Sequence, residues 1–169
     1  MMNIRKMTLL ANLLAIAIVL NIIESAFPII PVPGAKLGFA NIVTLVVLYI
    51  YSFKDSSVLT ILRVLLVALL SGKLLGPVFY MSAAGAIVAT IAMGLMKKTN
   101  FFGMIGVSVI GSIFHCLGQI IAGIFVIGSA AIIWYLPIML FLSIPSGALT
   151  GIIAKRFVAT WETWHNEIS

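Results

Sequence analysis

Six apolar runs follow one another along the chain, and this pattern constrains the fold more than any other feature. A membrane helix needs about 20 mostly apolar residues, and a bilayer offers its backbone no water to bond with. Only 8% of the 169 residues are charged, against about a quarter in a soluble domain. We therefore expect an all-α membrane protein in which residues 1–169 form a single integral membrane domain. The six transmembrane helices are expected at about 7–27, 37–53, 57–70, 78–96, 101–127 and 132–154.

The segment between the first two runs, Glu24 to Asn41, reads ESAFPIIPVPGAKLGFAN. Its prolines remove backbone donors and disfavour helix in the residues before them, so an irregular, Pro/Gly-rich loop is predicted. Irregular backbone at membrane depth is tolerated only where protein or a water-filled cavity satisfies its polar groups. The segment is therefore either an ordinary outer connection between two helices or part of a binding site.

The basic residues predict an orientation. The formal net charge is +6, and short basic loops between spans indicate orientation and contact with anionic lipid rather than with nucleic acid. With the N-terminus inside, seven of the ten Lys and Arg residues fall on the cytoplasmic side. These seven are Arg5, Lys6, Lys54, Lys97, Lys98, Lys155 and Arg156. Both termini are therefore expected in the cytoplasm, and Lys36, Arg63 and Lys73 are the exceptions.

Arg63 is the strongest candidate for a functional residue, because a charge in the middle of a span is costly unless it is paired or hydrated. It either pairs with Glu24 or faces a cavity where it holds an anionic group. Lys36 and Lys73 are either interface lysines or part of the same positive site, and Asn41 is a polar group near it. Three cations against one carboxylate leave two positive charges, which suits a carboxylate or phosphate ligand. The start of the second helix adds free N–H groups to such a site.

His115 and Gln119 are four residues apart, so they share one helix face. They either contact a polar ligand or make an interhelical hydrogen bond. No cluster of His, Cys or carboxylate residues has metal-ligand spacing, so no metal and no cofactor are expected. Ala11 and Ala15 also share a face, as a site of helix packing or of partner docking.

Enzyme motifs are missing from the sequence. The chain has four acidic residues, too few for the paired Asp clusters of magnesium-diphosphate chemistry. It also lacks the Gly-x-x-x-x-Gly-Lys loop of an ATPase. We therefore expect a protein that is not an enzyme and does not hydrolyse ATP by itself.

Four motifs resemble a known family: PVPGAKLGFANIVTL (31–45), LRVLLVALLSG (62–72), SAAGAIVA (82–89) and HCLGQ (115–119). They are similar to the Gx transporter family, often labelled heptaprenyl diphosphate synthase component I. That family is grouped with the S components of energy-coupling factor (ECF) transporters, which are six-helix membrane proteins that capture vitamins or metabolites. The resemblance implies docking onto a shared transmembrane subunit driven by two ATPases, through an Ala-xxx-Ala motif that Ala11 and Ala15 match.

The expected function is thus substrate binding in the bacterial plasma membrane. The ligand would be a small, anionic metabolite, or a vitamin- or isoprenoid-related compound, held by Glu24, Lys36, Asn41, Arg63, Lys73, His115 and Gln119. One alternative is a membrane subunit of a quinone- or flavin-linked extracellular electron-transfer system. Another is a component of a heptaprenyl diphosphate synthase, which the scarcity of acidic residues disfavours.

Overall fold

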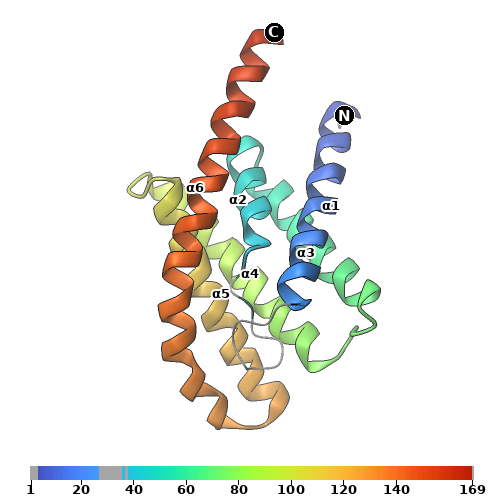
Figure 1. Ribbon diagram of the computed structural model, residues 1–169, viewed down its shortest axis with the longest axis vertical. Coiled ribbons are helices and arrows are strands. Elements are labelled where there is room, and N and C mark those ends of the chain that lie inside the picture. Colours follow the sequence, from blue (N-terminus) through green and yellow to red (C-terminus); the bar gives the residue numbers. More distant parts are fainter. Residues whose placement is uncertain (1–3, 27–35, 37, 169) are drawn as a thin grey trace.

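The computed structural model describes residues 4–26, 36 and 38–168. These residues form helices and no strand, which confirms the all-α class. The helices are α1 (Ile4–Ala26), α2 (Asn41–Ile50), α3 (Phe53–Leu70), α4 (Pro77–Thr99), α5 (Met104–Ile127), the 3-10 helix η1 (Ala130–Tyr135) and α6 (Leu136–Ile168). Both ends of the chain lie at the same end of the bundle (Figure 1).

Four helical stretches are long and apolar enough to cross a membrane: α1, α4, α5 and the continuous stretch from Ala130 to Trp164. The protein is therefore a multi-pass membrane protein. The six predicted spans are not confirmed, because α2 and α3 are not among these four. The 10 residues of α2 are about 15 Å long, half the thickness of a hydrocarbon core.

The second helix begins at Asn41, later than the predicted residue 37. Before it, the chain turns at Gly38, whose φ of +86° lies in the left-handed region that favours glycine. The Asn41 N–H donates to the Gly38 carbonyl at 2.8 Å, which closes the turn. Most of the predicted Pro/Gly-rich loop, residues 27–35 and 37, lies outside the described residues.

The last helix differs from its prediction in the opposite direction. Helix α6 continues without a break to Ile168, whereas the sequence suggested an end near residue 154. Its last turns extend past the neighbouring helices in Figure 1. Val158 explains the continuation, because it is 5% exposed and belongs to the hydrophobic core.

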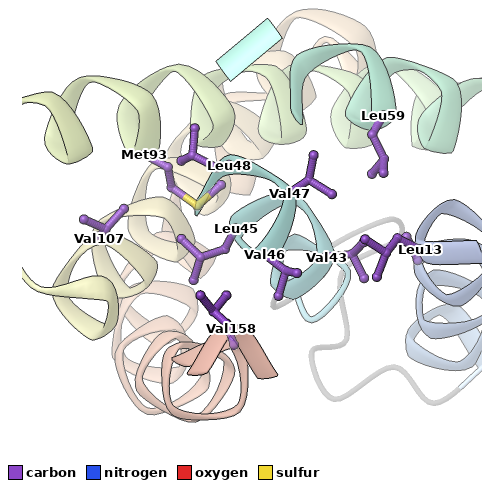
Figure 2. Packing of buried hydrophobic residues seen from close by; sticks show 12 residues of the cluster. Leu13, Val43, Leu45, Val46, Val47, Leu48, Leu59, Met93, Val107 and Val158 are labelled. Carbon is purple, nitrogen blue, oxygen red and sulfur yellow. The ribbon is translucent and has the colours of Figure 1, made fainter. Parts of the chain in front are cut away.

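Helix α2 is the centre of the core, and its residues 43 to 48 are all buried. Figure 2 shows Val43 beside Leu13 of α1, and Leu45 close to Val158 of α6. Every other α-helix contacts α2. A helix that is apolar on all sides is stable only when it is surrounded, so a short central α2 is consistent with its sequence.

Helices α4 and α5 pack closely through small residues. A Cβ atom at Gly118 would lie 2.9 Å from the Ala84 carbonyl oxygen and 3.0 Å from the Cα of Gly85. A Cβ atom at Gly85 would lie 2.7 Å from the Gln119 Cγ. Small residues allow such backbone approach between membrane helices. This contact fixes α5, and with it His115 and Gln119, against α4.

Candidate functional site

Polar side chains from four separate segments are buried together around the start of α2. Six of them are buried: Asn21, Lys36, Asn41, Arg63, His115 and Gln119. Glu24 of α1 joins them through backbone hydrogen bonds described below. We call these seven residues the polar cluster. It contains six of the seven residues that the sequence predicted for a binding site.

Lys36 connects α1 to α5 within the polar cluster. Its ammonium group donates to the Asn21 Oδ1, and its backbone N–H donates to the Gln119 Oε1 at 3.2 Å. From the sequence Asn21 is a weaker candidate, a polar group near the outer side, and it is not among the seven residues predicted for the site. The four-residue spacing of Leu13, Ala17 and Asn21 is the sequence signal that places Asn21 on the buried face of α1.

Glu24 holds the turn before α2. Its Oε1 accepts hydrogen bonds from the backbone N–H groups of Gly38 at 2.7 Å and Phe39 at 3.4 Å. A Cβ atom at Gly38 would lie 2.9 Å from the Asn41 Nδ2 and 3.4 Å from the His115 Cδ2. The turn therefore packs between the Asn41 amide and the His115 ring. The second carboxylate oxygen of Glu24, Oε2, is buried without a hydrogen-bond partner among the described residues.

Arg63 lies in the middle of α3 and is 1% exposed. Its Nη2 donates to the Asn41 Oδ1 at 3.3 Å, while Nε and Nη1 have no partner in the described part of the chain. The ion pair found among the described residues joins Lys6 and Asp55 at 2.8 Å. Glu24 and Arg63 therefore do not approach within 4 Å of each other, and their attraction acts over a longer distance.

His115 and Gln119 lie on one face of α5, as their spacing predicted, and both are buried. The two ring nitrogens of His115 have no hydrogen-bond partner within the described ranges. The Cε1 of the ring would lie 3.1 Å from a Cβ atom at Gly85. Helix α4 therefore restricts the position of the ring.

Lys73 lies outside the polar cluster. It follows α3 in an exposed turn, where its carbonyl accepts a hydrogen bond from the Gly76 N–H at 3.2 Å. The cations inside the cluster are thus Lys36 and Arg63, and Glu24 is its carboxylate. The formal charge of the cluster is +2 − 1 = +1, one less than the sequence count that included Lys73.

Ala11 and Ala15 are both exposed on α1, and neither belongs to the cluster. The intervening Leu13 and the following Ala17 are buried. The exposed pair is therefore not used for packing inside the described bundle, and its role in partner docking stays a prediction.

The polar cluster can donate hydrogen bonds to a negatively charged group. Arg63 and Asn41 offer unpartnered N–H donors, and Lys36 adds positive charge nearby. Among the described residues no three His, Cys, Asp or Glu side chains come together as a metal site requires.

One comparison with known proteins identifies the family. The family model described as heptaprenyl diphosphate synthase component I matches residues 13–157, which include the whole polar cluster. No curated protein and no solved structure matches the chain. The matched range covers most of the 169 residues. The chain therefore belongs to the heptaprenyl diphosphate synthase component I family, the Gx transporter family that its motifs resemble.

Proposed function

We propose that this protein is a substrate-binding membrane subunit, similar to an S component, that captures a small anionic metabolite for uptake. The observation that carries the proposal is Arg63. It is a fully buried cation whose Nε and Nη1 have no partner among the described residues, and Lys36 lies close enough to interact electrostatically with it. An anion in the polar cluster would supply the missing acceptors.

The energetic argument concerns the unpartnered atoms. A buried polar group without a hydrogen bond costs about 1–3 kcal/mol, and more when it is charged. Such groups are rare in native proteins and are found where a ligand, water or catalytic step completes them. In the polar cluster they include Arg63 Nε and Nη1, Asn41 Nδ2 and Glu24 Oε2. Their concentration around one helix start favours a ligand over isolated defects.

The proposal treats the chain as a binding subunit and not as a synthase. Of its four acidic residues, only Glu24 lies in the polar cluster. A single carboxylate cannot hold the magnesium ions that diphosphate chemistry uses. The chain also has no ATP-binding loop, so uptake would draw energy from partner ATPases.

The proposed orientation places both termini in the cytoplasm of a bacterial cell, with the protein in the plasma membrane. Both termini lie at one end of the bundle (Figure 1). Lys6 bonds to Asp55, and Lys97 donates to the Leu48 carbonyl at 2.6 Å, so both cations lie beside the connection between α2 and α3. This gathering of positive charge supports the orientation. Ala11 and Ala15 would dock onto the transmembrane subunit from the exposed side of α1.

The test is to extract small molecules from purified protein and identify them by mass spectrometry. Wild-type protein is compared with Arg63→Gln and with the control Arg156→Gln, which changes an exposed residue of α6. We expect the same anionic metabolite in extracts of wild type and control, and its loss from Arg63→Gln. Extracts without an enriched solute would contradict the proposal. Enrichment of a flavin or quinone would support the electron-transfer alternative instead.

A further inference from the structure

We infer that the polar cluster selects an organic monoanion that also carries a hydroxyl group, of the hydroxycarboxylate class. This inference rests on the proposed function and adds the charge and the hydrogen-bonding pattern of the ligand. Two observations carry it: the sum of the buried charges, and the types of the atoms that have no partner among the described residues.

The first observation is the net charge of +1. Lys36 and Arg63 contribute two positive charges, and Glu24 contributes one negative charge. Glu24 is counted as ionised because its Oε1 accepts two backbone N–H groups, which are hydrogen bonds that favour the carboxylate form. His115 is counted as neutral, because an imidazolium beside these cations would be an additional unpaired charge.

Other charges do not change this sum. Lys73 is exposed to solvent and lies outside the polar cluster, so its charge is not part of the buried sum. The residues between Ala26 and Lys36, together with Leu37, have no ionisable side chain in the sequence. Buried charge is costly unless it is compensated, so a ligand with one negative charge neutralises the cluster. A phosphate monoester dianion would leave it at −1.

The second observation is that both donors and an acceptor lack partners in the part of the chain that the structure describes. The donors are Arg63 Nε, Arg63 Nη1 and Asn41 Nδ2, each of which can donate to an anionic oxygen. The acceptor is Glu24 Oε2. It requires a donor on the ligand, because an anion without one would leave this oxygen buried and unbonded.

Together the two observations distinguish between ligand classes. A simple carboxylate satisfies the charge but offers no donor to Glu24. A zwitterionic amino acid offers a donor but has no net charge, so it does not neutralise the cluster. A hydroxycarboxylate satisfies both requirements, with the carboxylate at Arg63 and the hydroxyl donating to Glu24 Oε2. Glu24 is thereby assigned as a specificity-determining residue.

The experiment uses three probes with one carbon skeleton: 2-hydroxybutanoate, butanoate and butyl phosphate. Binding is measured by calorimetry on wild-type protein in lipid nanodiscs. It is repeated on Glu24→Gln and on the control Glu162→Gln, which changes an exposed residue of α6. Glutamine keeps an oxygen that can accept from Gly38, so the turn before α2 is retained.

We expect wild type and control to bind 2-hydroxybutanoate about tenfold more tightly than butanoate, since a hydrogen bond to a charged group is worth about 1.5 kcal/mol or more. In Glu24→Gln this preference should fall at least threefold (about 0.65 kcal/mol). Butyl phosphate should bind more tightly to Glu24→Gln than to wild type, because the cluster charge rises to +2.

Three results would overturn the inference: wild type that prefers butyl phosphate, equal binding of 2-hydroxybutanoate and butanoate, or no binding of any probe. They are distinguishable from failure of the proposed function. A dianion extracted from wild type but not from Arg63→Gln would contradict the hydroxycarboxylate assignment and would still support anion capture. An absence of any extracted solute would contradict both the hydroxycarboxylate assignment and anion capture.

Discussion

Replacing Arg63 by methionine should abolish ligand binding without destabilising the protein. Methionine fills the space of the arginine stem and carries no charge. The change removes two buried nitrogens that have no partner in the described ranges, Nε and Nη1, and each such atom costs about 1–3 kcal/mol. It also removes the donor to the Asn41 Oδ1, a loss of about 1.5–3 kcal/mol. The remaining charges of Lys36 and Glu24 sum to zero.

The net expectation for Arg63→Met is a gain of about 2 kcal/mol in the free energy of unfolding of the ligand-free protein, since gains of about 2–6 oppose a loss of about 1.5–3 kcal/mol. Apolar replacement of buried charged groups is often neutral or stabilising. Unfolding is followed by circular dichroism in mixed detergent micelles, with Arg156→Met as the exposed control within about 0.5 kcal/mol of wild type. A loss of more than about 2 kcal/mol in Arg63→Met would show that Arg63 is a structural residue and would refute the reasoning.

Three further predictions address the packing, the ion pair and the docking face. Gly118→Ala should lower the free energy of unfolding by about 1–3 kcal/mol, since its Cβ would overlap the backbone of α4. The control Gly103→Ala should change the free energy of unfolding little, because no atom lies within 4 Å of the added Cβ. Equal effects of the two variants in a detergent unfolding assay would contradict this packing. The side-chain hydrogen bond from Lys6 holds the pKa of Asp55, which lies outside the four candidate spans, below its ordinary 3.8. The stabilisation from Asp55 should therefore be present at neutral pH and fade as the pH falls below that value. The difference in unfolding free energy between wild type and Asp55→Asn should be below about 1 kcal/mol and should shrink on acidification. A difference that grows on acidification would refute the ion pair between Lys6 and Asp55. Ala15→Trp should leave stability within about 0.5 kcal/mol of wild type, because the site is exposed, yet prevent co-purification with the transporter ATPases, and intact co-purification would argue against the docking face.

The sequence predicted the class of the fold and several cluster residues for definable reasons. A protonated Arg63 in the middle of an apolar run is costly against lipid, so the sequence predicts that its side chain faces the interior of the bundle. His115 and Gln119 share a face by helical geometry alone. Both are local arguments, because periodicity and charge need no knowledge of the neighbouring helices.

The start of α2 and the position of Lys73 depend on contacts between distant segments. The residues after Lys36 are compatible with a helix in sequence. However, Glu24, 14 residues before Gly38, accepts a hydrogen bond from the backbone N–H of that glycine and stabilises a turn. Lys36 and Lys73 look alike in sequence. The contacts of Lys36 with Asn21 and Gln119 separate the buried lysine from the exposed one.

The end of α6 was also a question of tertiary structure. Lys155 and Arg156 follow an apolar run and indicate a helix that leaves the membrane. Helix α6 nevertheless continues, because Ala154 and Val158 pack into the core beside α2. Two consecutive basic residues mark the edge of an apolar segment, but they do not by themselves end a helix.

The most direct test of anion capture is an experimental structure of the protein purified from its native membrane with its co-purified solute. The polar cluster predicts density for a small molecule within hydrogen-bond distance of Arg63 Nε or Nη1. It also predicts that the same molecule reaches Glu24 Oε2. Water alone at these atoms, or a direct ion pair between Arg63 and Glu24, would contradict the account.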